Sequence, residues 1–330
     1  MRKPGPVVIA ALVTGVLLLG LTAPGVAPAE PEKLRAVAFL PENNDLVTGF
    51  KMFIDMVNKK FKDSVKIELL GGPEVTPPFQ LHEAVKNGTI DMCLTSCGYY
   101  PSLVWEAQSA MFSNKDYKDV AATEYHDIMT KLHEKAGLVW LGQGTFEMYF
   151  YFYANPEIKS VQDLKAKKIR IFPPVIPLVK ALGAVPVTLP MGDIYTAMER
   201  GTVDGFVMVP IGFVKDFSWN EVTKQVLDYP VYQATAVILA NKNKWDKLPE
   251  DVRKAIIAFK RETVDPAIAE YYKKLNAESW DALMKSGVKP VKFPGSEGAD
   301  FQAKAYEEAW SNISKKSPEL GPKLKQMLVK

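Results

Sequence analysis

Apolar and polar positions along the chain predict strands and helices in turn. An apolar run at 34–40 predicts a strand, and apolar positions at helical spacing over 44–61 predict the helix that follows it. Alternation at 65–70 predicts a second strand, residues 78–87 predict a short helix ended by Gly88, and residues 90–94 predict a third strand. This order of elements is typical of a parallel sheet.

The same order begins again in the second half of the chain. A helical turn at 160–164 precedes predicted strands at 168–172, 185–189 and 203–208, with helices at 177–182 and 193–200 between them. The segments LHEAVKNGTIDMCL (81–94) and IYTAMERGTVDGFV (194–207) are alike. This repeat predicts two α/β lobes built alike, with a ligand cleft where their strand ends face each other. Asp91 and Asp204 hold the same place in it, which favours a structural role for both.

A long helix is predicted after a strand at 237–240. The helical pattern starts at Pro249 and stops near Gly287, a length of about 57 Å at 1.5 Å per residue. Pro266 predicts a kink within it. Because one lobe is shorter than this, we expect the helix to span both lobes. A last amphipathic helix is predicted at 301–313.

Residues 1–29 are predicted to be a cleaved secretory signal peptide. Arg2 and Lys3 give a positive start, an uncharged and mostly apolar run follows at 7–21, and Ala27-Pro28-Ala29 forms a cleavage signal of small residues. The alternative is an uncleaved membrane anchor, but this run is shorter than the roughly 20 apolar residues that span a bilayer. We therefore expect an exported, periplasmic protein without an anchor.

Composition narrows the classes of function. The chain has 330 residues, of which 47% are hydrophobic and 24% charged, and its net charge of +3 gives no indication of a nucleic-acid partner. Cys93 and Cys97 are the only two cysteines. They are interpreted as small buried residues or as a disulfide, with metal ligation as a third alternative. No cofactor or metal is expected.

Catalytic motifs are absent from the sequence. The three histidines are His82, His126 and His133, and the seven-residue spacing of the last two differs from the close pair that binds a metal. The sequence contains neither a Gly-x-Ser-x-Gly elbow nor a phosphate-binding loop. We therefore predict that the protein is not an enzyme.

Three segments together resemble the substrate-binding proteins of TRAP transporters, the DctP-type family. They are EAVKNGTIDMCL (83–94), VQDLKAKKIRIFPP with LVKALGAVPVTLPMGDIYTAMERGTVDGF (161–206), and LANKNKWDKLPEDVRKAI (239–256). The resemblance implies a two-lobed α/β periplasmic binding protein fold, with the long kinked helix spanning both lobes. It also implies a receptor that closes on a small organic acid and delivers it to a membrane permease. Residues 30–147 plus 236–275 are expected to form lobe I, and 148–235 plus 276–330 lobe II.

The resemblance also implies that Arg170 grips the carboxylate of the ligand. A guanidinium is planar and permanently charged, and it can hold a carboxylate by two parallel hydrogen bonds. Many family members have a second Arg, which is missing at 148–152, and a polar Gln-Glu-Asn where this chain has Phe206-Val207-Met208. The matching surfaces are apolar: Met191, Phe206, Met208 and Phe172. We therefore predict a monocarboxylate with an apolar or aromatic body as the ligand, and a sulfonate could bind the same Arg.

The remaining candidate residues come from loops. Asn43, Ser96 and Tyr99 follow strands of the first lobe and are candidates for hydrogen bonds to the ligand, the alternative being turn residues that bond their own backbone. Phe213 and Tyr232 are further candidates for the cleft wall. A monomer that works with TRAP permease subunits is expected. A periplasmic enzyme or a ligand-sensing subunit on the same scaffold are the alternative functions.

Overall fold

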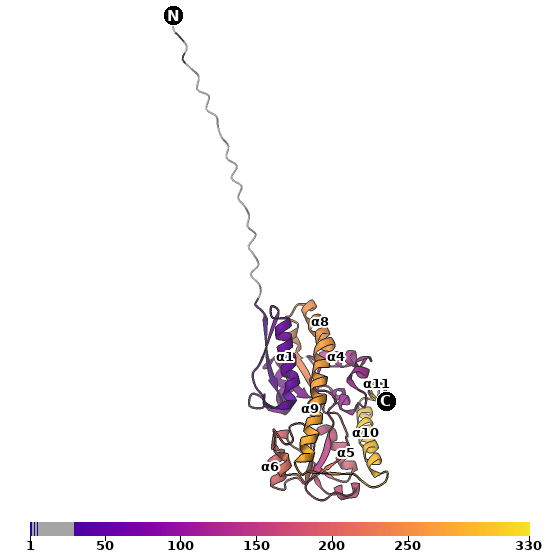
Figure 1. The fold of residues 1–330 in the computed structure, drawn as a ribbon. Coiled ribbons are helices and arrows are strands. Elements are labelled where there is room, and N and C mark those ends of the chain that lie inside the picture. Colours follow the sequence, from indigo (N-terminus) through magenta and orange to yellow (C-terminus); the bar gives the residue numbers. More distant parts are fainter. Residues whose placement is uncertain (2, 4, 6–29) are drawn as a thin grey trace.

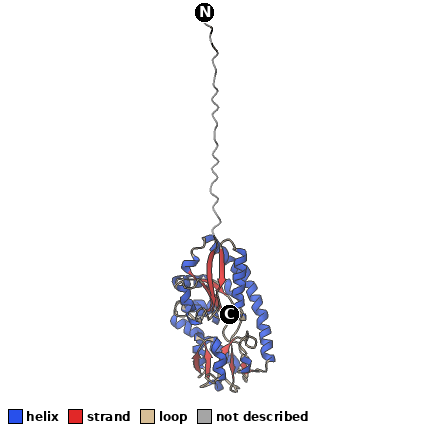
Figure 2. Ribbon diagram, turned by 90° about the vertical axis from the view of Figure 1, so that its left-hand side faces the viewer, coloured by secondary structure: helices blue, strands red, loops and turns tan. Residues whose placement is uncertain are grey.

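A computed structural model describes residues 1, 3, 5 and 30–330, so the predicted signal peptide lies outside the described residues. The strands gather in two separate sheets (Figure 2). The first lobe is built on the sheet β2-β1-β3-β10-β4 and the second lobe on β11-β9-β5-β8-β6-β7. The strand bounds are β1 Glu32–Ala38, β2 Val65–Leu69, β3 Met92–Ser96, β4 Leu138–Gln143, β5 Tyr151–Ala154, β6 Lys168–Ile171, β7 Val185–Thr188, β8 Gly205–Met208, β9 Gln225–Leu227, β10 Ala236–Asn241 and β11 Lys289–Val291.

The predicted repeat is confirmed in the strand order. In each lobe three parallel strands stand side by side, β2-β1-β3 in the first and β7-β6-β8 in the second. Asp91 accepts a hydrogen bond from the backbone N–H of Arg35 on β1 at 2.9 Å, and Asp204 accepts one from Lys168 on β6 at 2.7 Å. Both aspartates thus fix the middle one of the three parallel strands in their lobe, which is a structural role.

Neither sheet is wholly parallel, which the sequence pattern did not reveal. One strand in each sheet is antiparallel to both of its neighbours: β10 in the first lobe and β5 in the second. Each of these strands follows a chain crossing from the other lobe. Thr145 joins the two crossing segments, since its hydroxyl donates to Ala234 O at 3.0 Å and accepts from Ala236 N at 2.9 Å. The lobes are therefore connected by a paired, two-stranded hinge.

The predicted long helix runs alongside both lobes (Figure 1). It consists of α8 (Glu250–Phe259), a π-helical turn at Lys260–Val264 and α9 (Asp265–Lys285). The π turn ends two residues before Pro266, which lacks a backbone N–H and cannot continue a regular α-helical ladder. The Tyr272 hydroxyl donates to Leu46 O in the first lobe at 2.9 Å, and Trp280 packs on Tyr151 in the second at a ring distance of 4.7 Å. The helix thus braces both lobes.

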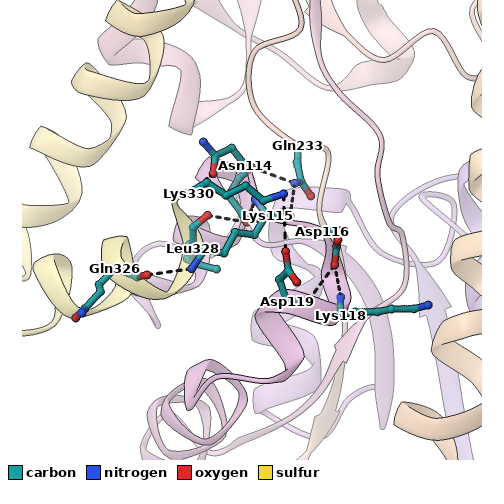
Figure 3. Close-up of polar contacts among 10 residues, drawn as sticks. Asn114, Lys115, Asp116, Lys118, Asp119, Gln233, Gln326, Leu328 and Lys330 are labelled. Atoms are coloured by element: carbon teal, nitrogen blue, oxygen red, sulfur yellow. Dashed lines mark hydrogen bonds and ion pairs between the residues drawn. The ribbon is translucent and has the colours of Figure 1, made fainter.

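A second brace is formed by α10 and by the C-terminal end of the chain. Phe301 packs on Phe152 of the second lobe, while the Trp310 indole donates to Phe112 O of the first at 3.3 Å. Figure 3 shows the last residues bonded to the segment 114–119. There Leu328 O accepts from Asn114 N at 3.1 Å.

The other helices cover the sheets, and some were not predicted. No helix within residues 30–330 is long and apolar enough to cross a membrane. Cys93 and Cys97 are buried and unpaired, so the disulfide alternative is wrong and the small-residue interpretation holds. The helix bounds not given above are α1 Thr48–Lys60, α2 Leu81–Lys86, α3 Tyr117–Ala121, α4 Tyr125–Lys135, α5 Ile176–Ala181, α6 Ile194–Glu199, α7 Lys242–Trp245, α10 Glu297–Lys316 and α11 Leu320–Leu328.

Candidate functional site

A cavity of about 50 Å³ lies between the lobes, where the carboxyl ends of β1 and β3 face those of β6 and β8. A buried water needs about 10–15 Å³ on this measure, so the cavity has room for about four waters. Its wall is formed by strand ends from both lobes and by the two crossing segments. The lining residues are Phe39, Leu46, Ser96, Tyr99, Thr145, Met148, Phe150, Arg170, Phe172, Met191, Met208, Val209, Ala234, Thr235 and Ala236.

Arg170 is the only charged side chain among the described residues that line this cavity. It projects from β6, and only 1% of its surface is exposed. Its Nε and Nη2 atoms both donate to Leu189 O, at 3.0 and 2.8 Å, and Nη1 approaches Val207 O at 3.5 Å. Three of the five N–H groups are therefore directed at backbone carbonyls. The other two, one on each terminal nitrogen, can be accepted together by one carboxylate.

The electrostatic surroundings leave the charge of Arg170 incompletely balanced. No carboxylate among residues 30–330 forms an ion pair with it. Burial lowers the pKa of Arg170, and the nearby Tyr99 and Asp193 act in the opposite direction. Enclosing a charge without a partner costs several kcal/mol, of order 3–5, in typical proteins. A bound anion would remove that cost.

Tyr99 is a polar side chain near Arg170, and each of the two groups shifts the pKa of the other. Burial raises the pKa of the Tyr99 hydroxyl, and the Arg170 guanidinium lowers it again. The ring is held against Phe79 and Phe39 at 4.4 and 6.0 Å. The Tyr99 hydroxyl and the Arg170 guanidinium therefore form one polar corner, supplied by opposite lobes.

The remaining wall is largely apolar. Phe150 and Phe172 pack against each other at 4.8 Å, and Met148, Met191 and Met208 complete this side. Methionine side chains are flexible and polarisable, so they can adapt to the shape of an apolar group. The hydroxyl of Thr145 already bonds the hinge backbone, as described above, and the Ser96 hydroxyl accepts from Gly98 N at 3.3 Å. Few polar groups are therefore left to bond a ligand.

The structure brings together six of the ten residues predicted from the sequence to contact the ligand. Arg170, Met191, Met208, Phe172, Ser96 and Tyr99 all line the cavity. Whether they bind a solute stays a prediction.

The other four predicted residues lie outside the lining. Asn43 is exposed at the surface of the first lobe. Phe206 and Phe213 pack into an aromatic cluster with Tyr153 and Trp219. The Tyr232 hydroxyl donates to Ala305 O at 2.7 Å, which turns it toward α10. The rings of Phe206, Phe213 and Tyr232 therefore pack in the protein core instead of lining the cavity.

Sequence reasoning missed the part of the wall made by the hinge. Met148, Phe150 and Ala234–Ala236 lie in the crossing segments, and Phe39 and Leu46 flank the end of β1. Crossing segments carry no periodic pattern of their own, so periodicity does not place them beside the cleft. Only the resemblance pointed to 148–152, as the place of a missing Arg. Among the residues lining the cavity there is no His, Cys, Asp, Glu or Lys. Within residues 30–330, no three metal-binding side chains gather in one place.

Comparisons with known proteins agree with this architecture. The family model for bacterial extracellular solute-binding protein, family 7, matches residues 36–317. The monocarboxylate 2-oxoacid-binding periplasmic protein of Nostoc sp. is 28% identical over 258 residues, which cover 74% of this chain and 68% of that protein. The C4-dicarboxylate-binding periplasmic protein DctP of Rhodobacter capsulatus is 26% identical over 273 residues, 79% of this chain and 80% of that protein.

Solved structures share the fold. A TRAP periplasmic solute binding protein from Desulfovibrio salexigens, with bound orotic acid, superposes with a TM-score of 0.80 at 18% identity, covering 90% of this chain and 97% of that chain.

Proposed function

The chain belongs to family 7 of the bacterial extracellular solute-binding proteins, and we propose that it captures a small monocarboxylate between its two lobes and delivers it to a TRAP permease. The single observation that carries this proposal is Arg170, which is buried without a carboxylate partner among the described residues and lines the interlobe cavity. Its two remaining N–H groups match one carboxylate. Export to the periplasm and a monomeric state are parts of the same proposal.

The number and kind of charged groups support a monocarboxylate over a diacid. The lining contains one cation, and a second carboxylate would lie against methionine and phenylalanine side chains. A sugar acid would place hydroxyl groups against the same wall, at a cost of about 1–3 kcal/mol for each one left unpaired. The small cavity favours a compact apolar body, and a larger aromatic body requires the methionines to move.

Capture is proposed to proceed by closure of the lobes. Arg170 is 1% exposed, so a solute reaches the guanidinium only when the lobes part. The motion is proposed to bend the paired hinge and α9, and closure then excludes water and strengthens the ion pair. The lobes are taken as residues 30–147 plus 236–275 and 148–235 plus 276–330, a division that the sheet membership of β4, β5, β10 and β11 supports.

A binding receptor is favoured over an enzyme on this scaffold. Hydrolysis or proton transfer needs a base, or a nucleophile activated by one, at the ligand. Hydroxyl groups such as those of Ser96 and Thr145 line the cavity, but no His, Cys, Asp, Glu or Lys of residues 30–330 stands in the lining to activate them.

The test is a thermal-shift screen of residues 30–330, purified by unfolding and refolding to remove any bound solute. The panel pairs small apolar monocarboxylates with diacids and sugar acids of equal carbon number. We expect stabilisation by the apolar monocarboxylates, by about 2.7 kcal/mol at 100 times the dissociation constant. Stabilisation by sugar acids alone would contradict the proposed ligand class.

A further inference from the structure

A group of polar contacts outside the cavity joins the two lobes directly. Asp216 Oδ2 in the second lobe accepts from Asn44 Nδ2 at 3.0 Å and from the backbone N–H of Asp45 at 3.2 Å, both in the first lobe. Lys215 Nζ adds bonds to the two carboxylate oxygens of Asp45, each at 3.1 Å. We call these four residues the clasp.

Residues close to the clasp in the chain line the cavity. Leu46, next to Asp45, lines the cavity from the first lobe. Val209, at the start of the loop that follows β8 and carries Lys215 and Asp216, lines it from the second. The clasp therefore joins the two lobes beside the wall of the cavity.

The first-lobe half of the clasp is held in place before the lobes meet. Asn44 is 5% exposed, and its Oδ1 accepts from Leu46 N at 3.0 Å, which leaves its amide nitrogen directed outward at Asp216. Leu46 O in turn accepts from the Tyr272 hydroxyl on α9. The 3-10 turn Asp45–Val47, which leads into α1, is thus fixed both by its own cap and by the long helix.

The second-lobe half is also rigid. Gly212 O accepts from the backbone N–H of Asp216 at 2.9 Å, and Gly212 has a φ of +74° with its Cβ position 2.9 Å from Asp216 Oδ2, so only glycine fits there. Phe217 stacks on the buried Trp219 at 4.3 Å, and Phe213 belongs to the same aromatic cluster. Two aromatic residues that lie outside the cavity therefore hold the loop that carries Asp216.

The two parts of the clasp differ in strength. The Lys215 side chain is 74% exposed, and ion pairs of that kind contribute about 0–1 kcal/mol. The Asp216 carboxylate is partly buried between two donors, although burial raises its pKa and offsets part of the gain. Asp216 is therefore the residue whose removal most weakens the closed arrangement.

We propose that Asp216 is a positioning residue for solute binding, whose carboxylate holds the lobes closed and sets how slowly a captured solute leaves. Every clasp contact is between protein atoms. The clasp therefore favours closure by the same factor for any solute, whereas Arg170 and Tyr99 discriminate between solutes. The proposal rests on the proposed function, in that the captured solute is an acid held between the lobes.

The experiment compares Asp216→Ala with the wild type and with a matched control, Asp228→Ala. Asp228 is also in the second lobe, but it pairs with Lys292 of the same lobe. Pyruvate, isobutyrate and isovalerate serve as probes. We expect Asp216→Ala to raise the dissociation rate of each acid that binds about tenfold and by the same factor for all, with the melting temperature of the solute-free protein unchanged. Asp216→Asn keeps an oxygen acceptor, so we expect it to raise the dissociation rate only about threefold or less.

A second measurement needs no solute, so it separates failure of the clasp from failure of the proposed function. Spin labels at Lys51 on α1 and Glu199 on α6, both exposed, report the distance between the lobes. We expect Asp216→Ala to reduce the ratio of short to long separations about tenfold. The proposal is overturned if that ratio is unchanged or the wild type shows no short separation. It is also overturned if rates change unequally between acids, or if Asp228→Ala acts like Asp216→Ala.

Discussion

Arg170 and Leu189 form a fork in which one carbonyl oxygen accepts from two nitrogens of the guanidinium, at 3.0 and 2.8 Å. The bond pair fixes the plane of the guanidinium and occupies the edge made by Nε and Nη2. It leaves N–H groups on the two terminal nitrogens for the cavity. Leu189 O therefore orients Arg170, while the charge of Arg170 stays available for a solute.

Two substitutions of Arg170 distinguish the contribution of its charge to solute binding from that of its fixed orientation. Arg170→Met is expected to weaken carboxylate binding by at least about 100-fold, because a bidentate charge-assisted pair contributes about 3 kcal/mol. Arg170→Lys keeps a charge but cannot form the fork to Leu189 O, so we expect an intermediate loss. Isothermal titration calorimetry measures both.

The solute-free protein is the control for the arginine variants. Removing a buried charge without a partner offsets the loss of the bonds to Leu189 and Val207, so Arg170→Met is expected to keep its melting temperature within about 3 °C. A large drop in that temperature would mean that Arg170 is mainly a structural residue.

A substitution at Gly98, in the first lobe, tests the close contact between the two lobes in the closed arrangement. A Cβ at Gly98 would lie 2.6 Å from Cγ and 2.9 Å from Cδ of Pro174, which belongs to the second lobe. Gly98→Ala should therefore prevent full closure and weaken solute binding more than about tenfold, with little change in solute-free stability. Gly192→Ala is the matched control, since nothing lies within 4 Å of its Cβ position. Equal affinities of the two variants would argue against closure on Pro174.

Tyr99 is expected to discriminate between acids by the group on their second carbon. Its hydroxyl lies beside the Arg170 guanidinium. We therefore expect an oxygen on that carbon to reach the hydroxyl when Arg170 holds the carboxylate. Tyr99→Phe should weaken binding of pyruvate about five- to thirtyfold, because pyruvate loses the hydrogen bond to its second-carbon oxygen. Binding of propionate, which has no oxygen on that carbon, should be nearly unchanged. Competition titrations give both constants, and equal losses for the two acids would refute this role.

Two histidines with lowered pKa values, the buried His133 and the half-buried His126, predict an acid-sensitive fold. Burial lowers the pKa of His133 to about 4 and that of His126 to about 3, from about 6.5 in the unfolded chain. The folded state therefore excludes protons that the unfolded state binds, so stability is full above pH 6.5 and falls as the pH drops toward 4. Each histidine is expected to lower the free energy of unfolding by about 2 kcal/mol at pH 5 relative to pH 7.5.

The measurement is urea unfolding of the wild type and His133→Gln at both pH values. His133 Nε2 accepts from the Tyr100 hydroxyl at 3.0 Å and Nδ1 donates to Met129 O at 2.7 Å, so the substitution lowers stability at pH 7.5. The difference between the two pH values should nevertheless shrink by about 2 kcal/mol. An unchanged difference would show that His133 is not neutral in the folded protein.

The sequence was sufficient to predict the repeated lobes, because helix and strand periodicity and the matching segments at 81–94 and 194–207 are local features. It did not predict that β10 and β5 run antiparallel, since strand direction depends on where the chain crosses between lobes. The crossings at 144–150 and 231–236 carry no periodic pattern, and β4 and β5 beside the first of them were not predicted.

Only part of the candidate site could be predicted from the sequence, because only some of its residues show their role by their type and pattern. Arg170 stands out as a charge within an apolar strand, and its place in the cavity agrees with that pattern. Its partner Leu189 acts through a backbone oxygen, which no residue type reveals. In the loop after β1 the sequence pointed to Asn43, whereas Asn44 is buried and reaches across the cleft. Neighbouring asparagines cannot be told apart without the cap that Asn44 forms at Leu46 N.

The most direct test of the account is a calorimetric titration of solute-free protein with a small monocarboxylate and with its primary amide. The pair is chosen from the acid that gives the largest thermal shift, so that size and shape are held constant while the charge is removed. The account predicts saturable binding of the acid, at least about 100-fold weaker binding of the amide, and loss of this preference in Arg170→Met. Equal affinity for the acid and the amide, or a preference that survives in Arg170→Met, would contradict carboxylate capture by Arg170.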